Sequence, residues 1–316
     1  MENNFALIGA AGYVAPKHMK AIKDTGNRLI TALDKSDSVG ILDSFSYGVS
    51  FFNEFERFDR HAEKLRRMGN QDRIHYVSIC SPNYLHDAHI RFALRIGANA
   101  ICEKPLVLNP WNIDAIKLLE EETQKKVFNV LQLRLHPSIV ELKRQIDKTP
   151  AKMYDIDLSY ITSRGRWYFV SWKGDISKSG GIATNIGIHF FDMLIWLFGG
   201  VRYQEVHLSD ATKMAGFIEL ENARIRWFLS VDSQDLPEAA KRSGSPTFRS
   251  ITVDGKEIEF SGGFAELHTR VHENILEGNG FGVEEARPSL NLVSSIRDTT
   301  PSIKNRAMVH PLADKY

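Results

Sequence analysis

Two polar residues stand four positions apart in an otherwise apolar stretch, GGIATNIGIHFFD at residues 180–192. On a helix, Asn185 and His189 would lie on the same face. A histidine titrates near neutral pH, so it can take a proton from a hydroxyl group. A histidine on an apolar helix is nevertheless more often a hydrogen-bonded core residue. The stretch alone therefore leaves both interpretations open.

A second candidate for chemistry is the glycine-containing turn GAAGYVA (9–15), which follows the apolar segment FALIG. Such a turn lets backbone N–H groups at a helix N-terminus bind a pyrophosphate. A tight strand-to-helix turn without a ligand is the alternative. The predicted cofactor contacts in this turn are Gly9, Ala11, Gly12, Tyr13 and Val14.

An acidic residue supports the dinucleotide interpretation. Asp34 ends the second strand-like segment, about 20 residues beyond the glycines, where a carboxylate binds the adenosine ribose hydroxyls. The same charge repels a 2′-phosphate, which favours NAD over NADP. Lys35 beside it leaves NADP open.

The elements that would position these groups follow from the hydrophobic pattern. Strand-like and helical segments alternate up to about residue 133, which predicts βαβ units and a parallel sheet. From residue 152 the alternation of polar and apolar residues predicts a largely antiparallel sheet with one open face. We therefore predict an α/β protein with a Rossmann domain over 1–133 and an α+β substrate domain over 134–316, whose C-terminal helix could return to the first domain.

The expected helices of this second part cover 264–277 and 283–298, and a long unpatterned connection covers 162–183. Loops of that length in a compact domain are usually functional or disordered. The aromatic and cationic residues in this one favour a function.

Composition excludes several classes of protein. The 316 residues carry a net charge of +1, with 43% hydrophobic and 25% charged residues, values typical of a soluble globular protein without nucleic acid or membrane partners. The segment MENNFALIGAAG has no signal-peptide pattern, so we expect a cytoplasmic protein. Cys80 and Cys102 have no metal-ligand spacing; we expect reduced thiols and no metal site.

The block YVSICSPNYLHDAHIRFALRIGANAICEKPL (76–106) resembles the glucose–fructose oxidoreductase/inositol dehydrogenase (Gfo/Idh/MocA) family. In that family a strand ends in T/S-P-N-x-x-H, and a later strand ends in E-K-P. The resemblance implies that Glu103 approaches the nicotinamide ribose and that Lys104 lies at the reacting carbon. A cation at the end of that strand can also stabilise alkoxide character as hydride leaves, although an exposed lysine is the common alternative. The further cofactor contacts that it implies are Ser81, Pro82, Asn83, Leu85, His86, Gln132 and Trp172.

The opening stretch matches the family pattern G-G-x-x-x-D-x-G-x-H-x-x-D. By this resemblance His189 is the general base, and Asn185 stands where most relatives have Asp. An Asn would not repel an anionic substrate, which suggests an acidic sugar; simple replacement of one hydrogen-bonding residue by another is the alternative. The predicted substrate contacts are Lys104, Arg164, Trp167, Tyr168, Lys173, Asn185 and His189, since Arg and aromatic groups suit carboxylates, phosphates and sugar faces.

Over almost its whole length the chain is similar to one subgroup, the UDP-N-acetyl-glucosaminuronate 3-dehydrogenases of bacterial O-antigen (lipopolysaccharide) synthesis. This implies NAD-dependent oxidation of the sugar C3 hydroxyl, with NADH either released or reoxidised in place by 2-oxoglutarate. It also implies a homotetramer and a pathway aminotransferase that uses the 3-keto product. A dehydrogenase of another sugar or inositol and a noncatalytic NAD-dependent sensor are the alternatives; the presence of both Lys104 and His189 disfavours the sensor.

Overall fold

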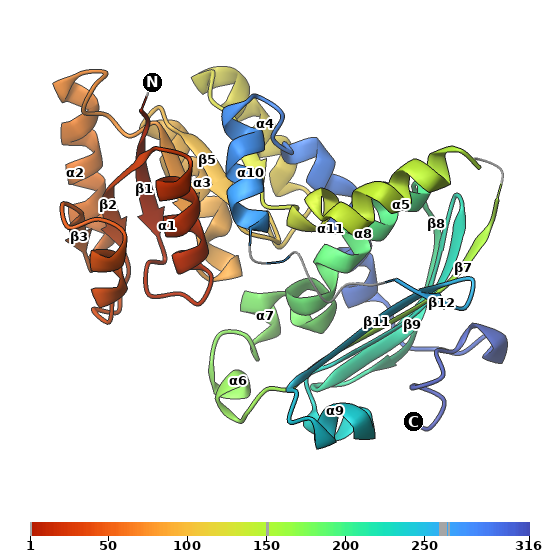
Figure 1. The fold of residues 1–316 in the computed structure, drawn as a ribbon. Coiled ribbons are helices and arrows are strands. Elements are labelled where there is room, and N and C mark those ends of the chain that lie inside the picture. The colour runs from red at the N-terminus through yellow and green to blue at the C-terminus, as the bar shows by residue number, and fades with distance from the viewer. Residues whose placement is uncertain (1, 150–151, 259–263, 265) are drawn as a thin grey trace. The chain divides into compact units, whose positions relative to one another are not determined.

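The computed structural model describes residues 2–149, 152–258, 264 and 266–316 (Figure 1). The chain forms two compact units. Unit 1 comprises Met1–Leu135 and Phe264–Arg287, and unit 2 comprises His136–Gly263 and Pro288–Tyr316. Residues 264–287, which the sequence placed in the second domain, therefore belong to the unit that contains the first. A hydrophobic pattern predicts that a helix forms but does not say which sheet that helix packs against.

Unit 1 is built on a parallel sheet. Its strands are β1 (Asn4–Ile8), β2 (Arg28–Leu33), β3 (Ser50–Phe52), β4 (Tyr76–Ile79), β5 (Asn99–Cys102) and β6 (Val127–Asn129). They lie in the order β3-β2-β1-β4-β5-β6, and every neighbouring pair is parallel. The order reverses beside β1, and open α/β sheets bind ligands at such a point, outside the carboxyl ends of the strands. The predicted Rossmann fold is confirmed.

The helices of unit 1 are α1 (Ala15–Asp24), α2 (Phe55–Met68), α3 (His86–Arg95), α4 (Asn112–Thr123) and α10 (Leu267–Leu276), with short helical turns η1 (Gly40–Ser44), η2 (Asn83–Leu85) and η3 (Gln132–Leu135). Helix α10 packs against α1 (Figure 1). The sequence analysis did not identify β3 and α2. Strand β3 has only three residues, too few to give a pattern. Helix α2 carries Phe55, Phe58, Ala62 and Leu65 at helical spacing, a signal that the sequence analysis did not use.

Unit 2 contains a mixed sheet of β7 (Tyr154–Thr162), β8 (Val201–Ser209), β9 (Lys213–Leu220), β10 (Ala223–Ser230), β11 (Thr247–Val253) and β12 (Lys256–Glu257). The order is β12-β11-β7-β10-β9-β8. The β7–β10 pair is parallel, and the other pairs are antiparallel. The mostly antiparallel sheet expected from the alternating residues is confirmed.

Two neighbouring aromatic residues show how this sheet is covered. Because side chains alternate along a strand, Trp227 and Phe228 of β10 point to opposite faces. Trp227 packs on Phe191 of helix α8 (Ile188–Phe198) with ring centroids 5.4 Å apart. Phe228 packs against His310 and Tyr316 of the C-terminal segment. The sheet face that was expected to be open is thus partly covered by the C-terminal segment. That segment has no regular hydrophobic pattern from which its packing on the sheet could be predicted.

The remaining helices are α5 (Pro137–Asp147), α6 (Trp167–Val170), α7 (Ile176–Ser179), the π-helical turn η4 (Ala183–Gly187), η5 (Ser233–Asp235), α9 (Glu238–Arg242), α11 (Val283–Asp298) and η6 (Arg306–Met308). Helix α11 has the predicted bounds. Helices α6 and α7 lie in the connection 162–183 that carried no pattern. The stretch Ile176–Phe198 is long and apolar enough to cross a membrane, but 72% of its most apolar window is buried inside the protein, as in the core helix of a globular domain.

Candidate active site

The first group of candidate residues is the glycine turn of unit 1. Gly9 has a φ of +91°, and a Cβ at this position would lie 2.6 Å from the backbone carbonyl of Cys80. A Cβ on Gly12 would lie 3.0 Å from the Gly9 carbonyl oxygen. Only glycine fits this close approach between the end of β1 and the end of β4. The turn leads directly into α1, which points its first N–H groups toward the same space.

Asp34 lies beside this turn, as expected. Its Oδ2 accepts a hydrogen bond of 2.9 Å from the backbone N–H of Ala11, and its Oδ1 accepts one of 2.9 Å from Ser36. These bonds orient the carboxylate at the end of β2. The exposed Tyr13 and Lys35 lie at the edge of the same region. The structure therefore brings together the residues predicted for the pyrophosphate and the adenosine ribose, and their chemistry fits NAD.

The predicted S-P-N-x-x-H segment joins two turns of unit 1. Ser81 and Asn83 are buried after β4, and the Ser81 hydroxyl bonds the Nδ1 of His89 at 2.8 Å. The His86 ring lies 2.6 Å from the Pro105 carbonyl oxygen through Nδ1 and 2.9 Å from the Ser81 carbonyl oxygen through Nε2. Burial lowers the pKa of His86. Both ring nitrogens thus lie at hydrogen-bond distance from backbone carbonyl oxygens, so His86 connects the turn after β4 to the turn that carries Lys104.

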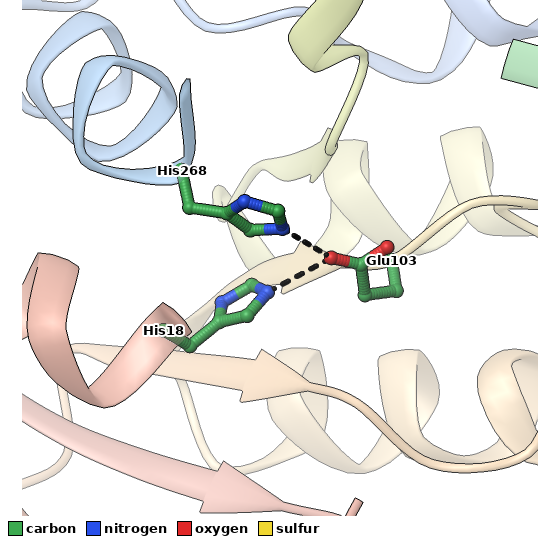
Figure 2. Close-up of side chains that lie close together, drawn as sticks. All are labelled: His18, Glu103 and His268. Carbon is green, nitrogen blue, oxygen red and sulfur yellow. Dashed lines mark hydrogen bonds and ion pairs between the residues drawn. The ribbon is translucent and has the colours of Figure 1, made fainter. Parts of the chain in front are cut away.

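Glu103 is a buried acid of unit 1. Two histidines of the same unit contact its carboxylate (Figure 2). The Nε2 atoms of His18 and His268 lie 3.1 and 3.0 Å from the same carboxylate oxygen, Oε1. Burial by itself would raise the pKa of Glu103, but the hydrogen bonds from the two imidazoles outweigh burial and hold that pKa well below its usual range. Sequence analysis found Glu103 but neither histidine. The i, i+4 spacing of His268 and His272 on a predicted helix was the available signal.

The other predicted cofactor residues lie after β4, β5 and β6 of unit 1, except for Trp172, which lies in unit 2. Lys104 comes directly after Glu103 and precedes Pro105 through a cis peptide bond. Gln132 lies on η3, just beyond β6, and is half-buried. Pro82 and Leu85 flank Asn83 in the turn before α3. Trp172 lies in unit 2, where the Lys173 Nζ stands 4.1 Å from its ring centroid.

A second group of candidate residues, in unit 2, lies on the helix that opens with Asn185 and His189. Residues 183–187 form a π-helical turn before α8, so the regular helix expected here begins only at Ile188. Single π-helical turns occur frequently at functional sites. Gly187 allows this close packing, since a Cβ there would lie 2.6 Å from the Leu229 Cδ1. The wider turn sets the directions of Asn185 and His189 relative to each other.

Asn185 is oriented by a residue from the predicted loop. Its Nδ2 donates a 2.9 Å hydrogen bond to the hydroxyl oxygen of Tyr168, a side chain that is 2% exposed. Burial raises the pKa of Tyr168. The amide nitrogen is therefore turned to the tyrosine, which leaves the amide oxygen directed elsewhere. Arg164 and Trp167 are exposed on the same segment.

Aromatic rings surround His189. The ring centroids of Phe190 and Tyr160 lie 4.3 and 5.9 Å from that of His189. Arg249 of β11 pairs with Tyr160 across the sheet, and its guanidinium stands 5.7 Å from the Tyr160 ring and 5.8 Å from the Phe190 ring. The sequence analysis missed Arg249, because an arginine in a short alternating strand looks like a solvent-exposed residue until the register is known.

Comparison with known proteins agrees with this arrangement. A family model described as "Oxidoreductase family, NAD-binding Rossmann fold" (GFO_IDH_MocA) matches residues 3–130, and that of its C-terminal alpha/beta domain matches residues 149–235.

The chain belongs to the Gfo/Idh/MocA oxidoreductase family.

Among solved structures, the chain is similar to the WlbA (WbpB) dehydrogenase from Thermus thermophilus. The two sequences are 49% identical, and the structure of that enzyme in complex with NAD and alpha-ketoglutarate matches with a TM-score of 0.94 over 98% of this chain and 99% of that one. Its complex with NAD and UDP-GlcNAcA gives a TM-score of 0.93. Among curated proteins, the inositol 2-dehydrogenase of Rhizobium meliloti is 26% identical over 63% of this chain, and the match spans 56% of that enzyme. The chain is an NAD-dependent oxidoreductase of this family.

Proposed function

We propose that this protein oxidises the C3 hydroxyl of UDP-N-acetyl-glucosaminuronate to a ketone with NAD as the hydride acceptor. The observation that carries the proposal is the similarity, at 49% identity over 98% of the chain, to a dehydrogenase whose structure contains NAD and UDP-GlcNAcA. The match to the inositol enzyme, at 26% identity over 63% of the chain, supports a shared fold and cofactor more than a shared substrate.

The proposed chemistry uses residues of both units. NAD, when bound, accepts the hydride from the sugar C3. Lys104, at the carboxyl end of β5, stabilises the developing alkoxide, and His189 takes the hydroxyl proton as general base. The C–H and O–H bonds break, and a C=O bond, a reduced nicotinamide and one proton on the base form. The proposed substrate contacts of unit 2 are Arg164, Trp167, Tyr168, Lys173 and Asn185.

A carboxylate-bearing substrate fits the charges of unit 2. Asn185 is neutral and held by Tyr168, and Arg249 supplies a cation over the two rings that contact His189. We assign Arg249 to the uronate carboxylate. Arg249→Gln should raise the KM for the acidic sugar at least about tenfold, while Arg242→Gln, an exposed control on α9, should leave it unchanged. An equal KM in both variants would contradict the assignment.

The proposal also covers the reoxidation of NADH, the oligomeric state, the cellular location and the pathway of the enzyme. The Thermus thermophilus complex with alpha-ketoglutarate supports reoxidation of NADH in place by this 2-oxo acid. We further propose a cytoplasmic homotetramer in O-antigen synthesis, whose 3-keto product goes to an aminotransferase.

The test is direct. The purified protein is mixed with NAD and either UDP-N-acetyl-glucosaminuronate or myo-inositol, with and without 2-oxoglutarate, and the absorbance of NADH is followed. We expect NADH with the nucleotide sugar and its loss on addition of 2-oxoglutarate. Turnover of myo-inositol in place of the nucleotide sugar would overturn the proposal. NAD binding without turnover of either compound would favour a sensor.

A further inference from the structure

Three elements distant in the sequence place their side chains around one buried carboxylate (Figure 2). His18 comes from α1, Glu103 from the turn after β5, and His268 from α10. A fourth member, His272, lies one helical turn beyond His268 and contacts His18 at 3.2 Å. Exposures of 0% for His18 and His272, 4% for His268 and 7% for Glu103 show that the cluster is nearly closed to solvent.

The hydrogen bonds define one protonation pattern. Because Oε1 of an ionised Glu103 can only accept, His18 and His268 must each donate from Nε2. A neutral His18 then has an accepting Nδ1, so His272 donates to it from Nε2. Neutral His18 and His272 of one tautomer, a His268 that donates from Nε2 and an ionised Glu103 satisfy every contact. Burial, the main cause, lowers the pKa of His18 and holds that of His272 well below its usual value, which agrees with neutral rings.

The two histidines bond the same oxygen of Glu103. Both imidazole contacts go to Oε1, so neither histidine occupies Oε2. A carboxylate has two oxygens that accept hydrogen bonds, and the second can accept one from a ligand. The neighbouring residue Lys104 is the proposed group at the reacting carbon, so the ligand end nearest to Oε2 is that of the nicotinamide.

A metal ion is the competing explanation, because the two Nε2 atoms and a carboxylate oxygen lie within 4.8 Å of one another. Two His and one carboxylate are also ligands that zinc accepts. Separations of 3.0 and 3.1 Å between each nitrogen and Oε1 are, however, normal hydrogen-bond lengths, and a metal would need both nitrogens without protons. The His272 contact continues the same donor chain. The geometry therefore favours a hydrogen-bonded network.

We propose that His18 and His268 are positioning residues that hold Glu103 as a fixed, ionised acceptor for a nicotinamide-ribose hydroxyl of NAD, with His272 fixing the tautomer of His18. Helix α10 thereby contributes a residue to the proposed NAD site of unit 1, although it lies more than 160 residues beyond Glu103 in the sequence. The inference rests on the proposed placement of Glu103 at that ribose, and it concerns cofactor binding, not sugar turnover.

The experiment measures NAD affinity by calorimetry between pH 6 and pH 8 in the full-length protein. His268→Leu removes a donor at similar volume, and His268→Gln keeps an N–H at the same reach. The control is His310→Leu, which removes a buried histidine of unit 2 that bonds Ser159. Thermal unfolding of each variant reports folding separately.

We expect His268→Leu to weaken NAD binding roughly tenfold at pH 8, and more at pH 6, because a buried carboxylate with one donor fewer protonates more easily. His268→Gln should restore most of the affinity and the flat pH profile of the native protein, and His310→Leu should leave the affinity unchanged. Should the Leu variant fail to fold, the shorter His268→Asn replaces it. The titratable groups that interact electrostatically with Glu103 are His18, Cys80, His86, Cys102, His268 and His272. Lys17 acts on His18, and Lys104 acts on His86.

Two outcomes separate the inference from its premise. Unchanged NAD affinity in Glu103→Gln would refute the placement of Glu103 at the ribose. Weaker binding in Glu103→Gln combined with native affinity and pH profile in folded His268→Leu would refute the network alone. A metal present at one equivalent in the purified protein and lost in His268→Leu would also overturn it.

Discussion

Substitution of Gly9 by alanine tests whether the glycine turn is the NAD site. The added Cβ would lie 2.6 Å from the carbonyl carbon and oxygen of Cys80, so the turn must move by at least 0.4 Å (3.0 − 2.6) to remove the clash and by 0.8 Å (3.4 − 2.6) to reach ordinary contact. The obstacle is backbone, which cannot rotate away as a side chain can. The φ of +91° adds a cost of about 1–2 kcal/mol for a residue with a side chain.

Gly26 supplies a matched control. It also has a positive φ, +70°, but an added Cβ there would meet nothing within 4 Å. Gly26→Ala therefore carries the backbone cost without the clash, in the same unit and just after α1.

Calorimetric titration with NAD and thermal unfolding of both variants give the answer. We expect Gly9→Ala to bind NAD at least about tenfold more weakly, since the displaced N–H groups no longer match the pyrophosphate, and to lose about 1–3 kcal/mol more stability than Gly26→Ala. Native NAD affinity in a folded Gly9→Ala variant would refute the assignment of this turn.

Three further predictions concern catalysis, specificity and pH. Lys104→Ala and His189→Ala should each abolish turnover of the nucleotide sugar while NAD still binds in calorimetry; retained turnover would remove that residue from the mechanism. Asn185→Asp should raise the KM for the acidic sugar by about five- to 150-fold, because a carboxylate pair about 6 Å apart costs about 1–3 kcal/mol at a partly buried site; unchanged kinetics would contradict the acidic-substrate proposal. The folded pKa of His272 lies below its usual value of 6.5, so the unfolded chain binds the extra proton and stability should fall as the pH drops below about 6.5. The depressed pKa of Glu103 acts in the same direction below about 4.5, and a melting temperature that does not change from pH 7.5 to pH 4 would contradict both.

The fold was predictable where hydrophobic periodicity was strong. Helix α11 has the predicted bounds, and the parallel and mostly antiparallel sheets occur where the patterns change. Strand β3 was missed because it is only three residues long, and helix α2 was missed although its apolar residues recur at helical spacing. The return of residues 264–287 to unit 1 depends on long-range packing, which local periodicity does not encode.

The candidate site divides in the same way. Gly9 and Asp34 were predicted from their spacing along the chain, and Glu103 was predicted from the resemblance of the E-K-P segment to the family pattern. His268 and Arg249 were missed because their roles depend on elements distant in the sequence. His268 bonds Glu103 after β5 and lies beside α1, and Arg249 pairs with Tyr160 of β7. The π-helical turn at Asn185 was not predicted either, because i→i+5 hydrogen bonds over a single turn do not change the spacing of apolar residues in a recognisable way.

The central claim is that hydride passes from the sugar C3 to NAD. Its most direct test is mass spectrometry after incubation of the enzyme with UDP-N-acetyl-glucosaminuronate that carries deuterium at C3. We predict NADH heavier by one mass unit and a ketone at C3 of the sugar that has lost its deuterium. Unlabelled NADH, or a product that keeps the deuterium at C3, would contradict the account.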